Sequence, residues 1–325
     1  MQKASFSLCI DTLLDGGVVA LPTETVYGLA CLALDSDAVD KVYQLKGRPS
    51  SNPLIVHVLN VEQAMEISYP DAICKLLCQK FWPGPLTLII PKRKVVPSNV
   101  TAGLDTVAMR SPSHPLFRKV LQSIGKPLAA PSANPYSKIS PTSAEEVMDS
   151  FGNTCPPVLD GGKCEIGLES TVLDLTCEAP TILRPGPISR TDVEKVIGRE
   201  LSNPTETFKS GIPRKSPGLS AKHYAPETPI RLYPDINALL KLAPSSSENL
   251  IIIPSKEFLS SFDSCPAKVI TFSESGDSME IGRNLYATLK KADLSKKKTI
   301  HLAMLEETDG MAEAINDRLR RASCS

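Results

Sequence analysis

The sequence lacks any apolar segment long enough to cross a membrane. None of its windows approaches the roughly 18 apolar residues that a spanning helix needs. Near its start, Lys3 and a short apolar patch interrupted by Asp11 are too little for a signal peptide. We therefore expect a cytoplasmic protein without membrane contact.

Cysteine pairs and histidine clusters are also missing. The nine cysteines are odd in number and scattered, and no CxxC pair occurs among them. The four histidines lie far apart along the chain. These absences argue against a disulfide framework and against a zinc site, so we expect no structural metal bound by the protein.

An excess of either charge is absent too. Lys and Arg total 36 against 36 Asp and Glu, and neither part is strongly basic when the chain is divided at residue 200. This balance counts against a protein that attracts nucleic acids through general charge.

What the sequence does contain is enough apolar residues for a large core. The chain has 325 residues and 42% hydrophobic content, which suggests two domains. In residues 1–200, apolar runs predict strands at 18–21, 54–58, 86–90, 106–109, 128–130, 171–175 and 182–183. Helical spacing predicts helices at 6–15, 36–45, 72–81, 114–124 and 143–151, the last with Thr142 and Glu145 as a capping box. The predicted strands and helices do not alternate strictly, so we expect a mixed α/β domain.

Residues 201–229 are rich in Ser, Pro and Thr and predict a linker. In residues 230–325, predicted strands at 230–233, 250–253, 268–272 and 299–304 alternate with predicted helices at 236–242, 256–262, 279–292 and 311–322. Four strand–helix pairs predict a small parallel sheet with covering helices, as in Rossmann-like domains. No GxGxxG or GxxxxGK[ST] motif occurs in this domain, so a phosphate-binding role for it has little support.

Polar residues gather at the ends of the strands predicted in the first domain. They fall in five segments: 23–28, 45–58, 101–112, 129–143 and 167–176. Open α/β sheets build ligand sites at such strand ends. Ser, Thr, Asn and Pro also favour ordinary capped turns, so each segment alone has two interpretations.

Four cations favour the ligand-site interpretation. Lys46 and Arg48 lie in a Gly- and Pro-containing loop, where we expect them to be exposed, and Arg110 and Arg184 end apolar strands. Such a set suits an anionic ligand, although each one alone could be a solvated surface base. His57, in the run LIVHV, shares a strand face with Ile55 and is either a core residue or a pocket ligand.

Several motifs together resemble one family. In order along about residues 5–200 they are PTETVYGL, KGRPSSNPLIVH, WPGPLTLIIP, TVAMRSP, APSAN and GLESTV, and SPGLSAKHYAP follows in the linker. This pattern resembles the YrdC/Sua5 family, in its full-length Sua5 form. The resemblance implies a YrdC-like mixed α/β catalytic domain with a concave pocket at 1–200, a linker at 201–229 and a Sua5-type domain at 230–325.

The resemblance also implies a reaction. L-threonine, bicarbonate and ATP, with Mg²⁺ accompanying the ATP, would give L-threonylcarbamoyladenylate and pyrophosphate. Downstream threonylcarbamoyl transferase machinery would use this product for the N6-threonylcarbamoyl modification of adenosine 37 in tRNA. A weak contact with tRNA itself is compatible with this role.

The family pattern assigns roles to individual residues. Lys46 and Arg48 would be the catalytic cations, and Asn134 belongs to a family signature. The implied threonine-binding residues are Thr25, His57, Arg110, Ala130 and Ser170. The implied ATP-binding residues are Arg48, Asn52, Thr106, Ser132, Ser140, Arg184 and Tyr224.

The implied chemistry needs no protein nucleophile. A carbamate formed on the threonine nitrogen attacks the α-phosphate, so the protein supplies positioning and charge stabilisation. Arg110 suits the substrate carboxylate, and His57 is one candidate for accepting the proton of the threonine ammonium group. Within the PTET motif, Thr25 is expected to face the amino acid while Thr23 and Glu24 support the turn.

The linker motif departs from the family pattern at residues 219–222, where a basic and an aromatic residue are usual. Tyr224 therefore has two interpretations, as a nucleotide contact or as a residue packed against the first domain.

Two other functions compete with adenylate synthesis. One is a double-stranded RNA-binding module, which the neutral charge disfavours, and the other is carbamoyl transfer in hydrogenase maturation, whose zinc-binding cysteine pairs are missing here.

Overall fold

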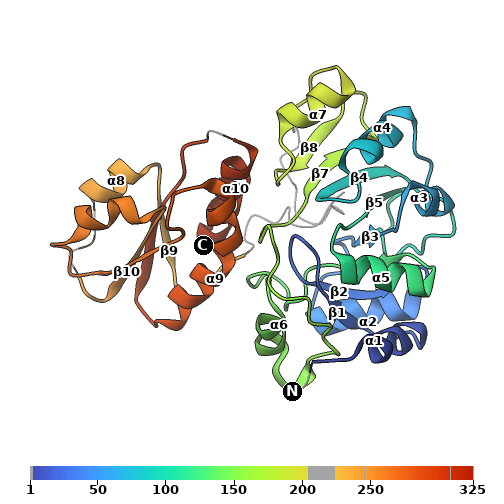
Figure 1. Cartoon of the computed structure of the whole chain (residues 1–325), viewed down its shortest axis with the longest axis horizontal. Coiled ribbons are helices and arrows are strands. Elements are labelled where there is room, and N and C mark those ends of the chain that lie inside the picture. The colour runs from blue at the N-terminus through green and yellow to red at the C-terminus, as the bar shows by residue number, and fades with distance from the viewer. Residues whose placement is uncertain (1–2, 204–223, 243, 245, 308, 325) are drawn as a thin grey trace. The chain divides into compact units, whose positions relative to one another are not determined.

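The computed structural model describes residues 3–203, 224–242, 244, 246–307 and 309–324 (Figure 1). This part of the chain divides into two compact units. The first comprises most of residues 3–203, and the second comprises most of residues 224–324 together with segments 137–139 and 166–168. Most of the predicted linker, residues 204–223, lies outside the described residues.

The first unit is built on a mixed sheet with the strand order β1-β2-β6-β3-β5-β4-β7-β8 (Figure 1). Its strands are β1 (Val19–Leu21), β2 (Gly28–Leu32), β3 (Ile55–His57), β4 (Leu86–Pro91), β5 (Thr106–Arg110), β6 (Leu128–Ala129), β7 (Thr171–Asp174) and β8 (Thr181–Arg184). The neighbours β3 and β5 run parallel, as do β4 and β7, and the other neighbours are antiparallel.

The helices of this unit begin and end at residues suited to these positions. They are α1 (Phe6–Leu14), α2 (Ser36–Lys46), α3 (Val61–Ile67), α4 (Ala72–Phe81), α5 (Pro115–Ile124), α6 (Ala144–Phe151), the 3₁₀ turn η1 (Gly152–Thr154) and α7 (Arg190–Ile197). Asp35 caps the start of α2, and Gly47 ends it with a φ of 60° that glycine adopts without strain. The end of α2 brings Lys46 next to the site described below.

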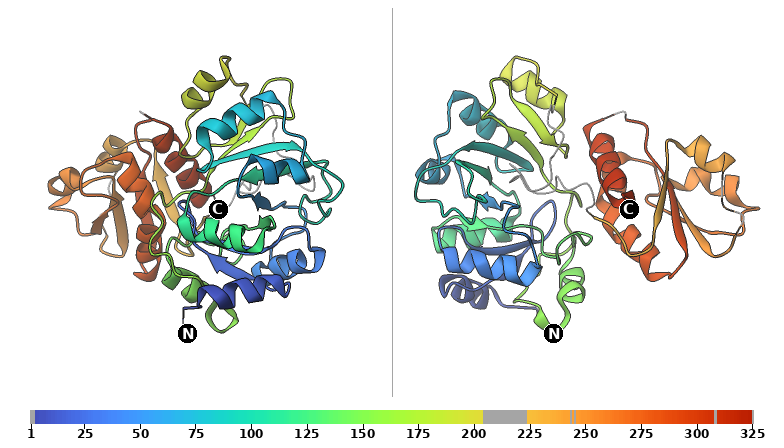
Figure 2. Two further views of the ribbon diagram at one scale, coloured as in Figure 1. Left: turned by 45° about the vertical axis from the view of Figure 1, so that its right-hand side comes forward. Right: turned by 180° about the vertical axis from the view of Figure 1, so that it is seen from behind.

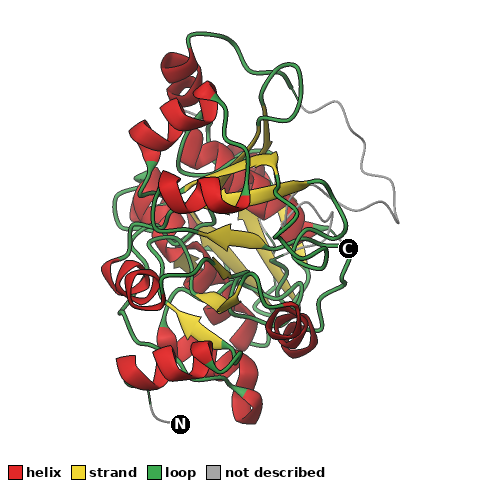
Figure 3. Cartoon of the chain, turned by 90° about the vertical axis from the view of Figure 1, so that its right-hand side faces the viewer, coloured by secondary structure: helices red, strands yellow, loops and turns green. Residues whose placement is uncertain are grey.

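Helices flank the strands of the first unit, as Figure 3 shows with helices in red and strands in yellow. Residues of α2, α3 and α4 pack with the strands in a large core that includes Val42, Val56 and Leu77. On the opposite face, α1 and α5 pack over β1, β2 and β6 in a second core that includes Leu13 and Phe117. Burial of these apolar side chains is the main stabilising contribution to the fold.

A third apolar cluster consists of strand residues alone. We call it the apolar floor, and its members are Ile55, Ile89, Ala108, Val172 and the partly buried Leu183. They come from β3, β4, β5, β7 and β8, which are adjacent in the sheet. This floor lies between the strand ends that carry the predicted site residues.

The second unit has a sheet of four parallel strands in the order β11-β10-β12-β9. Its elements are β9 (Ile230–Tyr233), α8 (Ile236–Lys241), β10 (Asn249–Ile253), the 3₁₀ helix η2 (Lys256–Phe262), β11 (Lys268–Thr271), α9 (Ser278–Leu294), β12 (Thr299–Ala303) and α10 (Gly310–Ser323). Figure 2 shows α9 and α10 side by side on one face of this sheet, and α8 and η2 pack with the strands around Leu239 and Phe262.

The structure confirms the mixed α/β fold of the first part and the parallel α/β fold of the second. Strand β2 was not predicted, nor were α3 and α7. The capping box predicted for Thr142 and Glu145 is wrong by one residue. Ser143 is the N-cap of α6 and accepts a hydrogen bond from Glu146 N, and the Glu146 carboxylate in turn accepts one from Thr142 N. Within the described ranges, no helix is long and apolar enough to span a bilayer.

Candidate active site

The ends of five strands of the first sheet lie side by side, and we call such a row of strand ends an edge of the sheet. The carboxyl ends of β3, β5 and β8 lie there together with the amino ends of β4 and β7, because of the strand directions. Within this edge His57 pairs in register with Arg110, and Val172 pairs with Arg184. The sheet topology therefore brings His57, Arg110 and Arg184 to one edge of the apolar floor.

The PTET motif forms a turn organised by Thr23. The Thr23 hydroxyl donates to Val26 O at 2.6 Å and accepts from the backbone N–H groups of Thr25 and Val26. It also lies 2.8 Å from the hydroxyl of Thr25, which accepts a hydrogen bond from Arg110 Nη1 at 2.9 Å. Thr23 supports the turn, as expected, and the turn holds the Thr25 hydroxyl against the Arg110 guanidinium.

Arg110 is a buried cation with contacts on three of its nitrogens. Besides the bond to Thr25, its Nε donates to Gly84 O at 3.2 Å, and its Nη2 lies 2.6 Å from Glu24 Oε1. The side chains of both members of this ion pair are 4% exposed. Burial of a guanidinium requires such partners, because an isolated charge is strongly disfavoured in the interior.

His57 is buried beside Arg110. Its ring lies 5.1 Å from the ring of Phe117, and its Nδ1 has no hydrogen-bond partner in the described part of the chain. Burial and the positive charge of Arg110 lower the pKa of His57 to about 3, against a smaller opposing effect of the Ile55 and Leu128 backbone. A ring with this pKa is neutral and only weakly basic at pH 7, which disfavours His57 as the proton acceptor.

Ser170 and Arg184 form one hydrogen-bonded group at the same edge. Arg184 donates from Nε and Nη2 to Ser170 O, at 3.1 and 2.9 Å, and from Nη2 to the Ser170 hydroxyl. That hydroxyl lies 2.8 Å from the hydroxyl of Thr87 on β4. The sequence assigned Ser170 to threonine and Arg184 to ATP, and the structure brings these two residues into direct contact.

Lys46 is buried, and the expectation of an exposed loop cation is wrong. It is the last residue of α2 and is 3% exposed. Its Nζ donates to Ser132 O at 2.5 Å and to Asn134 O. Burial, and then the nearby charge of Arg48, lower its pKa well below the ordinary value for lysine. Contacts with residues far along the chain, which local sequence does not reveal, explain the difference.

Arg48 is buried as well, which corrects the same expectation. Its Nε donates to Asn52 O at 3.0 Å, and its Nη2 donates to Pro53 O at 2.9 Å. Its guanidinium carbon lies 6.0 Å from the centre of the Tyr136 ring. These contacts place Arg48 beside the amino end of β3, opposite the edge that carries His57.

The other residues assigned to the ligands also lie in the first unit. Ala130 N donates to Ile55 O, and Ser132 pairs with Gly28 beside the same end of β3. Thr106 begins β5, and the buried Asn134 follows Ser132 in the same loop. The buried Ser140 donates to Glu169 Oε1 at 2.7 Å.

The site thus has two groups of cations on either side of the apolar floor. Arg110 and Arg184 lie at one edge, and Lys46 and Arg48 at the other. Strand β3 runs from one edge toward the other and has three residues, so its first and last Cα atoms are about 7 Å apart. An apolar surface with charged groups at both ends suits a ligand with separate anionic parts.

Two buried carboxylates in this region were not assigned as site residues from the sequence. They are Glu24, in the PTET motif, and Glu169, in the GLEST motif. Their positions within motifs were the only available signal, because a single carboxylate in a polar turn does not reveal its burial. Both lie in direct contact with an assigned residue, Arg110 for Glu24 and Ser140 for Glu169.

Tyr224 is buried within the second unit. Its ring stacks on that of Tyr286 at 5.6 Å, and the guanidinium carbon of Arg318 lies 5.3 Å from its centre. The sequence suggested a nucleotide contact or packing against the first domain, and it did not suggest this packing on residues of the second unit. The contact with a nucleotide stays a prediction.

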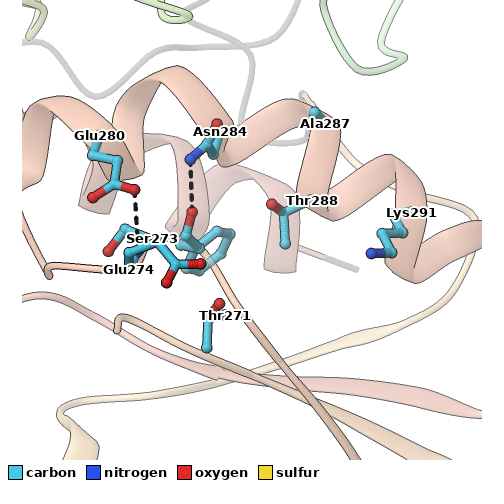
Figure 4. A pocket seen from close by; sticks show the side chains of 9 residues that line it. Thr271, Ser273, Glu274, Glu280, Asn284, Ala287, Thr288 and Lys291 are labelled. Atoms are coloured by element: carbon cyan, nitrogen blue, oxygen red, sulfur yellow. Dashed lines mark hydrogen bonds between the residues drawn. The ribbon is translucent and has the colours of Figure 1, made fainter. Parts of the chain in front are cut away.

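The second unit contains a hollow of about 270 Å³ between the end of β11 and α9 (Figure 4). Two of its polar side chains already bind neighbouring groups. Glu280 accepts hydrogen bonds from the backbone of Glu274 and Ser275, and Asn284 Nδ2 donates to Phe272 O at 3.0 Å. We therefore locate the candidate active site in the first unit.

The first unit defines a class of protein, an α/β ligand-binding domain with buried cations around an apolar floor. Comparison with known proteins identifies the family. Residues 11–186 match the model of the Sua5, YciO and YrdC family, which is described as "Telomere recombination". Residues 188–324 match the C-terminal domain of threonylcarbamoyl-AMP synthase.

Individual relatives agree with these matches. The chain is 40% identical over 322 residues to the threonylcarbamoyl-AMP synthase of Pyrococcus abyssi, covering 95% of this chain and 91% of that protein. It is 35% identical over 352 residues to the enzyme of Schizosaccharomyces pombe, covering 94% and 84%. The crystal structure of P. abyssi Sua5 complexed with L-threonine is similar with a TM-score of 0.89 and 36% identity, over 98% of this chain and 94% of that one. The chain belongs to the Sua5 family of threonylcarbamoyl-AMP synthases, which confirms the resemblance found in the motifs.

Proposed function

We propose that this chain converts L-threonine, bicarbonate and ATP into L-threonylcarbamoyl-AMP and pyrophosphate. The observation that carries the proposal is the pair of buried cation groups at the two edges of the apolar floor. The similarity to a Sua5 protein crystallised with L-threonine supports it.

Threonine binds at the edge that carries Arg110. The guanidinium receives the substrate carboxylate, because arginine offers a planar set of donors matched to a carboxylate. Thr25 and His57 lie beside this group, and the neutral ring of His57 adds no further charge. Ser170 and Ala130 complete the set of residues assigned to threonine.

ATP binds with its phosphates toward the other cations. Lys46 and Arg48 lie at the opposite edge, near Asn52, Thr106 and Ser132. Mg²⁺ enters as part of the MgATP substrate, held mainly by phosphate oxygens, as is common for this hard cation. Among the described residues, no group of three His, Cys, Asp or Glu side chains is placed to hold a metal ion.

The Ser170–Arg184 group is the proposed meeting point of the two substrates, because Ser170 is assigned to threonine, Arg184 is assigned to ATP, and the two side chains are in contact. The threonine ammonium group first loses a proton, bicarbonate takes up a proton and gives CO2 and water, and the amine adds to CO2 to form the carbamate with release of a second proton to solvent. A carbamate oxygen then attacks the α-phosphorus of ATP, the bond to the β-phosphate oxygen breaks, and pyrophosphate leaves. Arg184 stabilises the charge on the α-phosphate during this exchange, and positioning by the surrounding residues supplies the rest.

The later fate of the product stays a prediction. We propose that a downstream threonylcarbamoyl transferase uses the adenylate for tRNA modification. The cytoplasmic location and a weak contact with tRNA are further predictions from the sequence.

The test is release of pyrophosphate by the purified chain. We expect release only when threonine, bicarbonate and ATP are all present, and we expect Arg110→Lys to reduce it at least about 100-fold, because the bidentate contact with the substrate carboxylate is lost. Arg93→Lys is the matched control, since Arg93 lies over Tyr69, away from the floor. Equal release with serine, or without an amino acid, would contradict the proposal.

A further inference from the structure

Glu24 places a buried carboxylate directly against the cation proposed to bind threonine. Its Oε1 lies 2.6 Å from Arg110 Nη2, and its Oε2 accepts a hydrogen bond from Ser113 N at 3.2 Å. Despite the short distance, neither Oε1 nor Nη2 makes an aligned hydrogen bond in the described part of the chain. The two charges compensate each other at this distance, so a ligand that approaches the Arg110 guanidinium also approaches the Glu24 carboxylate.

The charge of Glu24 changes which ligands Arg110 can accept. An anion that binds Arg110 brings a second negative charge close to a buried carboxylate, and such repulsion is strong where water does not screen it. A zwitterion brings its own positive charge into the same space. The α-nitrogen of an amino acid is only two bonds from its carboxyl carbon, so its ammonium group falls near the carboxylate of Glu24 when its carboxylate binds Arg110.

We propose that Glu24 makes the Arg110 site selective for a zwitterionic α-amino acid and rejects anions that lack an ammonium group. The proposal rests on the proposed function, which assigns the threonine carboxylate to Arg110. It assigns Glu24 a role in specificity through an unfavourable interaction with the wrong ligand as well as a favourable one with the right ligand.

This selectivity matters because a co-substrate of the proposed reaction is itself an anion. Bicarbonate offers a planar carboxylate-like group that a guanidinium binds readily. An Arg110 without the neighbouring Glu24 charge would hold bicarbonate in the place of the threonine carboxylate. Glu24 keeps that place for threonine.

The test compares two ligands that differ only in the amino group. Calorimetry with the full chain measures the Kd of L-threonine and of 3-hydroxybutanoate, which is threonine without its amine. We expect the wild type to bind threonine at least about 100-fold more tightly. Glu24→Gln keeps the size of the side chain and removes its charge, so we expect threonine to bind more weakly, 3-hydroxybutanoate to bind more tightly, and the ratio to fall about 100-fold.

Two controls separate charge from structure. Glu24→Asp keeps the charge and should keep most of the preference for threonine, whereas a purely structural role for Glu24 predicts that Glu24→Gln weakens both ligands equally. Added bicarbonate should raise the apparent Kd of threonine in Glu24→Gln and not in the wild type.

The outcomes distinguish this inference from the proposed function. Normal threonine binding with an unchanged ratio in Glu24→Gln overturns the inference alone. Wild-type binding of 3-hydroxybutanoate within tenfold of threonine also overturns it, even if the variant fails to fold. A wild type that does not bind threonine overturns the proposed function and the inference together.

Discussion

Two buried cations, Lys46 in the first unit and Arg318 in the second, have different partners. In the first unit, the Nζ of Lys46 is held by the neutral carbonyl oxygens of Ser132 and Asn134. In the second unit, Arg318 is also buried, but its Nη1 lies 2.6 Å from the carboxylate of Asp317. Carbonyl partners satisfy the hydrogen bonds of an ammonium group but leave its charge uncompensated, whereas a carboxylate compensates both.

This difference indicates that the charge of Lys46 has a functional role and the charge of Arg318 a structural one. The lowered pKa of Lys46 reflects the cost of keeping a charge in that environment, and a bound phosphate would remove the cost. Arg318 already has a carboxylate partner, Asp317, which it shares with Arg321, and it lies over the Tyr224 ring. We therefore expect mutations at Lys46 to change function and mutations at Arg318 to change stability.

The largest effect is expected from Lys46→Met. The substitution fills the same space without the charge, so we expect kcat/KM for pyrophosphate release to fall at least about 1000-fold. We expect the free energy of unfolding to change by less than about 1 kcal/mol, since loss of an uncompensated charge offsets loss of two hydrogen bonds. Lys94→Met, at an exposed position, is the control. Activity within tenfold of the wild type would break the comparison.

A smaller but clear effect is expected from Arg318→Met. This change removes one partner of a buried ion pair and should lower the free energy of unfolding by about 3 kcal/mol, measured by chemical denaturation. Arg320→Met is matched in chemistry but exposed, and its ion pair with Glu307 is worth at most about 0.5 kcal/mol. Equal losses in the two variants would show that burial of Arg318 carries no special energy.

His57 extends the comparison to a third buried ionisable side chain, whose lowered pKa should make the stability of the protein depend on pH. The unfolded chain takes up a proton at this residue below a pH of about 6.5, while the folded protein does so only near a pKa of about 3. The free energy of unfolding should therefore fall as the pH drops through this window, by about 2 kcal/mol at pH 5. His57→Asn should lack this contribution. Denaturation curves at pH 7 and pH 5 test it, and the same pH dependence in both proteins would contradict the lowered pKa.

The smallest effect is expected from two serines of the second unit. Ser255 Oγ is buried and has no hydrogen-bond partner among the residues described, whereas Ser273 Oγ donates to Pro254 O and accepts from Gly276 N, both at 2.8 Å. Ser255→Ala should be neutral or stabilise the protein by up to about 1 kcal/mol, and Ser273→Ala should destabilise it by about 1–2 kcal/mol. Thermal unfolding of both variants gives the sign, and a destabilised Ser255→Ala would point to a partner for this hydroxyl.

The sequence predicted the regular elements better than the burial of charge. Apolar runs identified most strands, and strict alternation identified the parallel sheet of the second unit. Strand β2 was missed because GLACL contains glycine, alanine and cysteine instead of the β-branched residues that mark strands. The five residues are nevertheless all buried, because neighbouring strands and helices cover them.

The motifs suggested which residues form the site, which stays a prediction, but they did not indicate how these residues are buried and paired. The Gly and Pro residues around Lys46 and Arg48 indicated an exposed loop, and only contacts with residues 132–134, some 86 positions away, bury the lysine. The pairing of Glu24 with Arg110 likewise joins positions 86 apart, since Arg110 ends a strand and Glu24 lies in a distant turn. Such contacts depend on the tertiary fold and cannot be inferred from the local pattern of a single sequence.

The apolar floor has a consequence for the lifetime of the product. A carbamoyl adenylate is a mixed anhydride, which water attacks readily. The side chains of Ile55, Ile89, Ala108 and Val172 offer no group that could hold or activate a water molecule beneath it. In the proposed reaction, an adenylate bound on this surface would be shielded from hydrolysis on that side, which would give the strands that form the floor a second role in protecting the product.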